Sequence, residues 1–148
     1  MKRNATAAIA TLVRWREFEE SRASDVYRQR AVEAEKRRGM LDQAETSVDD
    51  VRRYRLDLLQ APRLDMARLH VASGVEAIAR LKADECETEL KTARERQEAA
   101  RAIHVAARAQ TRVAESRRAR VSACESERIE KTLFDWMADL RVSGRSKT

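Results

Sequence analysis

The segment Leu58-Leu59-Gln60-Ala61-Pro62-Arg63-Leu64 contains the only proline of the 148-residue chain. Proline lacks a backbone N–H and its ring clashes with the preceding helical turn, so a helix is expected to end just before Pro62. Outward from this point the chain is rich in Ala, Arg and Glu, and its only glycines are Gly39, Gly74 and Gly144. Alanine, arginine and glutamate favour helix. The sequence therefore predicts an all-α fold, a long antiparallel two-helix coiled coil that folds back at Pro62.

The predicted hairpin occupies the whole chain, 1–148, as a single domain. We expect a first helix over about 5–60, a bend over about 61–74, a second helix over about 75–141 and a basic tail over 142–148. Within the bend, Leu64 to Ala72 is expected to form a short helix, and Ser73-Gly74 to turn the chain again. The charged and apolar start faintly resembles a signal peptide, but helical residues follow it and helix is preferred.

The composition excludes several classes of protein. With 38% charged and 4% aromatic residues, the chain is poorly suited to a thick globular core and well suited to a coiled coil, with disorder as the main alternative. Charges recur too often for a membrane span. Cys86 and Cys124 lie far apart without metal-ligand spacing, which fits a reducing cytosol.

Helical periodicity predicts the faces that meet. In the first helix the inward stripe is predicted at Met40, Ala44, Val48, Val51, Tyr54 and Leu58. In the second it is predicted at Leu90, Ala93, Gln97, Ala100, Ile103, Ala107, Gln110, Ala114, Arg117, Val121 and Cys124. This second stripe is polar and rich in alanine, so it buries little apolar area and its middle is expected to be marginally stable.

The end of the second helix is predicted to be a binding surface. Ile129, Leu133, Trp136 and Leu140 are expected to continue the stripe, while Phe134 and Met137 widen it. Because the second helix is the longer, its last turns should project beyond the first helix and expose this apolar tip next to a basic tail. A second interpretation is that these residues cap the coil against Ile9, Leu12 and Trp15, and the two can hold together if one face packs internally while the other is presented.

The sequence does not predict an enzyme. It lacks a phosphate-binding glycine loop, a nucleophile elbow and any ligand-spaced metal group, so no catalytic residue, cofactor or metal is expected. His70 and His104 are interpreted as ordinary helix residues. The stretch from Arg101 to Val121 is strongly basic, and nucleic-acid binding is kept as an alternative function, although no reading motif accompanies the charge.

A short run near the C-terminus resembles a known family. Glu130-Lys131-Thr132-Leu133-Phe134-Asp135-Trp136 is similar to a run in the FliJ/YscO/HrpO family, the stalk proteins of flagellar and virulence type III secretion systems. The family pattern is Gln or Glu, Lys, any residue, an apolar residue, two acids and Phe. Trp136 replaces that Phe, and Phe134 stands where the first acid is usual. Near the bend, Gln43, Tyr54-Arg55 and Ala77-Ile78 also resemble family positions.

The resemblance implies a cytoplasmic, non-enzymatic stalk, peripheral to the inner-membrane apparatus and similar to the gamma subunit of rotary ATPases. Its paired termini would bind a hexameric export ATPase and its bend the export gate, with secretion chaperones as further candidate partners. The gate contact would fall on Gln43, Tyr54 and Ala77. The ATPase contact would fall on Ile129, Glu130, Lys131, Leu133, Asp135, Trp136, Met137, Leu140 and Arg141, assisted by Arg145. A partly disordered coiled-coil adaptor remains a further alternative.

Overall fold

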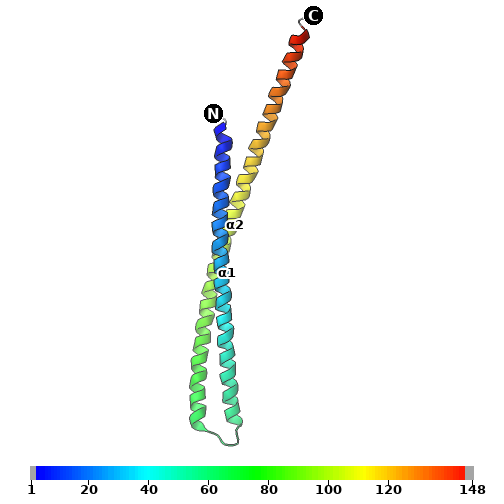
Figure 1. Ribbon diagram of the computed structural model, residues 1–148. Helices are drawn as coiled ribbons and strands as arrows, with labels where there is room; N and C mark the ends of the chain where they lie inside the picture. Colours follow the sequence, from blue (N-terminus) through cyan, green and yellow to red (C-terminus); the bar gives the residue numbers. More distant parts are fainter. Residues whose placement is uncertain (1–2, 146–148) are drawn as a thin grey trace. The chain divides into compact units, whose positions relative to one another are not determined.

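The computed structural model describes residues 3–145, with side chains described from 6 to 141. It contains helix α1, Arg3–Gln60, and helix α2, Met66–Arg145, joined by residues 61–65, and no strand within this described range. The two helices pack against each other, and the chain runs along α1 toward the loop and along α2 away from it (Figure 1). The predicted all-α two-helix hairpin is confirmed.

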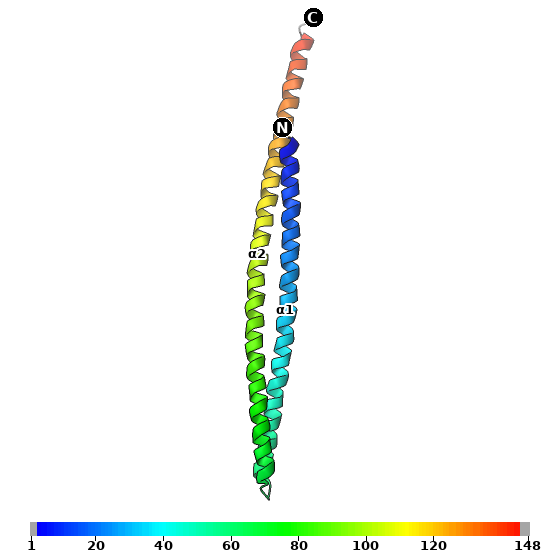
Figure 2. The same ribbon diagram turned by 90° about the vertical axis from the view of Figure 1, so that its left-hand side faces the viewer.

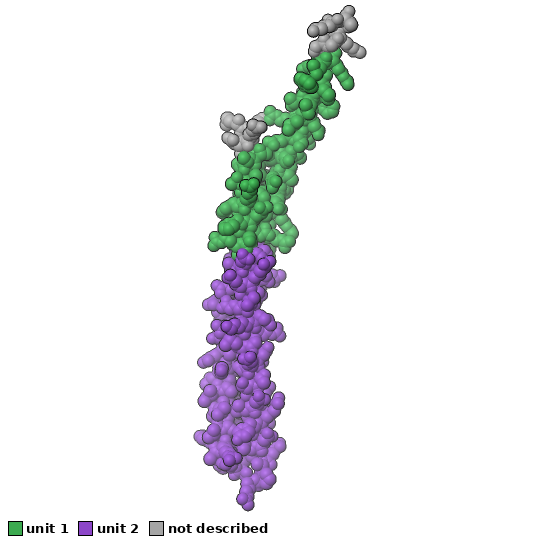
Figure 3. Space-filling view, in the orientation of Figure 1, with its two compact units in different colours: residues 1–22, 105–148 green, residues 23–104 purple. Residues whose placement is uncertain are grey.

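The chain divides into two compact units (Figure 3). Unit 2 consists of Ala23–His104 and includes the loop, and in it the adjoining parts of α1 and α2 lie side by side. Unit 1 consists of the described residues up to Arg22 and those from Val105 onward. In unit 1 the start of α1 lies beside α2, and α2 continues past it (Figures 1 and 2).

The bend is shorter than the sequence pattern indicated. Helix α1 ends at Gln60, and Pro62 disfavours a helical backbone at the residue before it. Helix α2 begins at Met66 rather than at Val75, because Asp65 caps it. The Asp65 carboxylate accepts a hydrogen bond from the backbone N–H of Arg68 at 3.1 Å, which satisfies one of the donors left open at a helix start.

No second turn occurs at Ser73-Gly74, so that expectation was wrong. Both residues lie inside α2, and the Ser73 hydroxyl donates a hydrogen bond to the Leu69 carbonyl at 2.9 Å. A single glycine is tolerated within a long helix at a cost of about 1 kcal/mol relative to alanine. The segment predicted as a separate short helix is the first part of α2.

The packed face of each helix follows an uninterrupted heptad register, alternating steps of three and four residues. The least exposed residues of α2 up to Ala114 are Leu69, Ala72, Glu76, Ala79, Ala83, Cys86, Leu90, Ala93, Gln97, Ala100, His104, Ala107, Thr111 and Ala114, and Val121 and Glu125 are half-buried further along. Those of α1 that face them are Thr6, Ile9, Val13, Arg16, Glu20, Ala23, Tyr27, Arg30, Ala34, Arg37, Leu41, Ala44, Val48, Val51, Arg55 and Leu58. We call this packed face the seam.

Several predicted inward positions lie one residue away from the seam. His104, not Ile103, points inward, where its ring stacks on Tyr27 with 6.1 Å between the ring centroids, while Ile103 is 64% exposed. Thr111 likewise replaces Gln110, and Arg117 and Cys124 are exposed. In α1, Leu41 and Arg55 take the places predicted for Met40 and Tyr54. At Ile103 and Tyr54 the prediction failed because an apolar or aromatic residue was preferred where the polar neighbour, His104 or Arg55, faces the partner helix.

Polar contacts across the seam set the register of the helices. Among the described side chains, six of the nine buried apolar residues are alanines, so burial contributes little per layer. In unit 1, Arg16 donates a hydrogen bond to the Gln110 side chain at 2.6 Å, and the Thr111 hydroxyl donates one to the Arg16 carbonyl at 3.2 Å. In unit 2, Arg37 pairs with Glu89.

Candidate functional site: two docking surfaces

The last turns of α2 have no partner helix among the described residues. Arg16 contacts Gln110, and because the helices are antiparallel, Arg3 lies about level with Ala123. All residues over 126–141 are exposed. Figures 1 and 2 both show this part of α2 continuing past the start of α1. The projection expected from the unequal helix lengths is therefore present within unit 1.

This projecting segment carries a row of exposed apolar side chains that we call the terminal stripe. Its members and their exposed fractions are Ile129 (61%), Leu133 (53%), Trp136 (60%) and Leu140 (51%). Phe134 and Met137 beside it are also exposed, at 66% and 46%. The alternative in which these residues cap the coil against Ile9, Leu12 and Trp15 is wrong, because Trp15 lies level with Thr111 and Ile9 with Arg117.

The terminal stripe is not a continuation of the seam, contrary to the sequence interpretation. The heptad register of α2 passes from Ala114 through Arg118, Val121, Glu125, Arg128, Thr132, Asp135 and Asp139. The terminal stripe occupies the positions one residue later, which turns it by about 100° around the helix. It is a separate face of α2, directed toward something other than α1.

A second exposed apolar surface lies beside the loop, in unit 2. We call it the bend groove, and it is lined by Asp50, Val51, Tyr54, Ala67, Arg68, Val71, Ala72 and Val75. Tyr54 is 52% exposed, Val71 64% and Val75 45%. Asp50 and Arg68 supply the only charges on its lining, so the groove is suited to an apolar ligand surface.

The structure separates the three residues predicted for gate binding. Tyr54 lines the bend groove, but Ala77 does not. Ala77 follows Val75 by two residues and is therefore turned by about 200° to the other side of α2. Ile78, 68% exposed, lies on the groove side instead. Gln43 is exposed on α1, three helical turns from Tyr54 and outside the groove. The seam register is the signal that excludes Ala77, whereas Gln43 shares the side of α1 that carries Tyr54 and differs only in its level along the helix.

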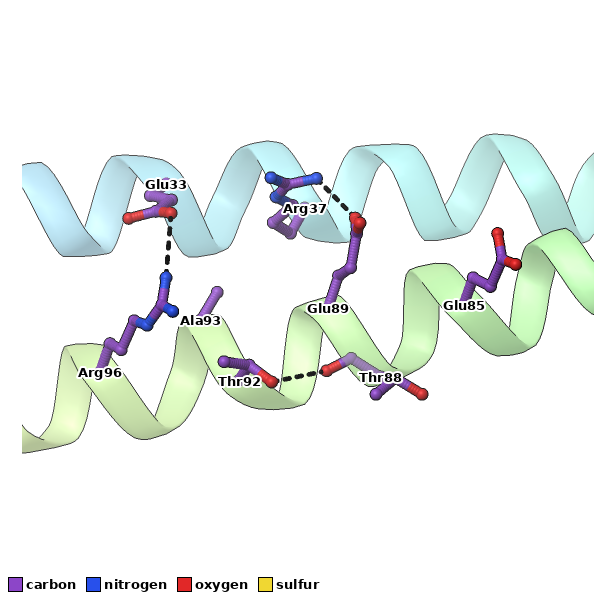
Figure 4. A pocket seen from close by; sticks show the side chains of 8 residues that line it. All are labelled: Glu33, Arg37, Glu85, Thr88, Glu89, Thr92, Ala93 and Arg96. Atoms are coloured by element: carbon purple, nitrogen blue, oxygen red, sulfur yellow. Dashed lines mark hydrogen bonds and ion pairs between the residues drawn. The ribbon is translucent and has the colours of Figure 1, made fainter.

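A charged cluster between the helices of unit 2 is structural in character (Figure 4). Arg37 pairs with Glu89, and Arg96 lies 3.9 Å from Glu33, so both contacts join α1 to α2. A hydrogen bond from Arg30 at 2.7 Å holds the pKa of Glu33 below its usual range, with further lowering by the charges of Arg30, Arg96 and Arg37. These contacts therefore tie α1 to α2 within unit 2.

Other kinds of site find no support among the described residues. No group of three or more His, Cys, Asp or Glu side chains is placed to hold a metal ion within this range. Neither helix, as described, is long and apolar enough to cross a membrane. The basic residues after Val105 do not gather on one face: Arg108 and Arg117 are nine residues apart, which turns them to opposite sides of α2.

The fold and its two exposed surfaces define a class of protein, the antiparallel two-helix hairpin with exposed apolar faces on its helices. Comparison of the chain with protein-family models, with curated proteins and with solved structures gave no match.

Proposed function

We propose that this protein is a non-enzymatic stalk of a type III secretion apparatus, which binds a hexameric export ATPase through the terminal stripe and the export gate through the bend groove. The observation that carries the proposal is the position of the family-like run Glu130–Trp136. It falls on the part of α2 that lies past α1, where every residue is exposed. A run of this kind on a helix without a partner is suited to recognition by another protein.

The ATPase contact is proposed to combine apolar anchors with surrounding charges. Ile129, Leu133, Trp136, Met137 and Leu140 supply the apolar area, and a large exposed aromatic such as Trp136 is the residue type that most often dominates binding energy. Glu130, Lys131, Asp135 and Arg141 are exposed around them and would orient the partner. Arg145 is helical, but its side chain and the rest of the predicted basic tail, 142–148, lie outside the described side chains.

The gate contact is proposed for the bend groove, centred on Tyr54 rather than on all three predicted residues. Val71 and Val75 from α2 and Val51 from α1 surround Tyr54 with apolar surface. Ile78 extends this surface along α2. Ala77 and Gln43 are dropped from the gate contact because they lie outside the groove.

The test of the ATPase contact compares two full-length variants that each lose one exposed apolar side chain. Trp136→Ala should reduce retention of the export ATPase of the native host by about tenfold or more, since interface aromatics are frequent hot spots. Ile103→Ala, which removes a side chain of similar exposure on unit 2, should leave retention unchanged. Circular dichroism should show equal helicity in both variants.

Two results would contradict the proposal. One is that Trp136→Ala retains the ATPase as well as the unaltered chain does. The other is that retention of partners depends on nucleic acid and declines steeply with salt, which would instead favour the alternative of a basic nucleic-acid-binding coil.

A further inference from the structure

The terminal stripe is the exposed end of a longer second heptad pattern on α2. Counted from Ile129 toward the N-terminus in alternating steps of three and four residues, the pattern continues at Ser126, Ser122 and Ala119. The pattern thus consists of small residues followed by large apolar ones: Ala119, Ser122, Ser126, Ile129, Leu133, Trp136 and Leu140. We call these seven residues the outer face. An uninterrupted pattern of this kind is what a helix presents to another helix in a coiled coil.

The small residues of the outer face lie at the level where α1 still runs beside α2, so a further helix would have least room there. Ala119 lies about level with Ala7 of α1, and Ser122 lies just short of the level of Arg3. Beyond that point α2 is alone, and the outer face switches to Ile, Leu and Trp. Small side chains allow two helix axes to approach closely, whereas large ones fill a wider space. The outer face therefore fits a helix that begins beside the hairpin and continues along the unpartnered part of α2.

The positions that flank the outer face are acidic over the projecting segment. In the heptad pattern of the outer face, the flanking charged residues after Ser122 are Glu125, Glu130 and Asp139. Arg128 and Lys131 fall on other sides of the helix. Glu125 and Glu130 form no ion pair with any residue in the described part of the chain. Charges at such flanking positions select the partner of a coiled coil and its orientation.

We propose that the outer face binds a single α-helix of a partner protein, with an apolar seam and with Lys or Arg at its flanking positions. In a parallel pair of copies, Glu125 of one chain would face Glu130 of the other, which disfavours self-association. The identity of the partner as the export ATPase rests on the proposed function. The helical and basic character of the bound segment rests on the outer face alone.

A peptide assay on the full chain tests the inference without the ATPase. The probe is a tryptophan-free helical peptide about three heptads long, with Leu at its seam positions and Lys at its flanking positions. The protein carries Trp15→Phe, so that its fluorescence comes from Trp136, which is 60% exposed. Binding of the peptide should shift the Trp136 emission to shorter wavelength and reach saturation.

Matched variants and a second peptide define the expected result. A peptide that is identical except for Glu at the flanking positions should bind at least tenfold more weakly. The double variant Glu125→Lys/Glu130→Lys should reverse this preference. Leu133→Ala should weaken the Lys peptide about tenfold, whereas Val113→Ala, which removes a side chain of 69% exposure from another side of α2, should not.

Three results would overturn the inference. These are absence of binding by either peptide, equal binding of the two peptides, and self-association of the chain in sedimentation equilibrium that Leu133→Ala abolishes. Failure of the proposed function is distinguishable from these, because the peptide preference would then persist while the export ATPase is not retained.

Discussion

Arg55 Nε of α1 lies 3.0 Å from Glu76 Oε2 of α2, and Glu76 is only 3% exposed. Arg80, one turn further along α2, donates to the other oxygen of the same carboxylate. Replacing such a buried ion pair by apolar residues is often neutral, but removing one partner is costly because it leaves a charge in the interior. The relationship fixes which turn of α1 faces which turn of α2 beside the loop.

We expect Arg55→Ala to lower the free energy of unfolding by about 2–3 kcal/mol, because it deprives the buried Glu76 carboxylate of its partner from the other helix. Arg80→Ala is the matched control. It removes an arginine whose side chain is 58% exposed, and should cost no more than about 1 kcal/mol. Urea unfolding followed by circular dichroism measures both. Equal losses of unfolding free energy in the two variants would show that the Arg55–Glu76 contact between the helices contributes no more than the exposed Arg80 contact.

Gly74→Ala should stabilise the protein by up to about 1 kcal/mol, because Gly74 is helical and alanine has the higher helix propensity. A Cβ added at Gly74 would meet no atom within 4 Å, and the same holds for Gly39. Gly39→Ala should therefore give a similar gain. Thermal unfolding of both variants measures the change. A loss of stability would mean that the chain bends at Ser73-Gly74 in solution, as the sequence pattern suggested.

The stability of unit 2 should depend on the ionisation of Glu33. The hydrogen bond from Arg30 lowers its pKa in the folded protein, so the stabilising contribution is present above the ordinary glutamate pKa and is lost as the pH falls through the lowered value. Glu33→Gln should therefore be less stable than the unaltered chain at pH 7, and the two should converge once the pH falls below the lowered pKa of Glu33. Melting temperatures across this range provide the measurement, and a difference that persists at low pH would contradict it.

Tyr54→Ala should weaken binding of the cytoplasmic domain of the export gate by about tenfold, since it removes the largest side chain of the bend groove. Leu59→Ala is the control, because Leu59 is also 50% exposed near the loop but lies outside the groove. Stability should change little in either variant. Equal binding by the two variants in a titration would exclude the groove as the gate contact.

The sequence predicts the hairpin well because a single residue, Pro62, separates two long helix-forming segments. Periodicity alone places the start of α2 too late, whereas an aspartate just before a helical pattern, here Asp65, is the signal of the true start. The seam was misplaced at Ile103 and Tyr54 for a different reason. Its inward positions include His104 and Arg55, which become favourable only through Tyr27 and Glu76 on the other helix.

The angular offset between the seam and the terminal stripe has a thermodynamic consequence. A docked helix and α1 would contact different sides of α2, so both can be packed on α2 at the same time. Side chains that share no contact contribute to free energy almost additively. Substitutions in the seam should therefore change the free energy with which α1 packs on α2. Substitutions in the terminal stripe should change the free energy of partner binding, and each kind of substitution should leave the other free energy nearly unchanged.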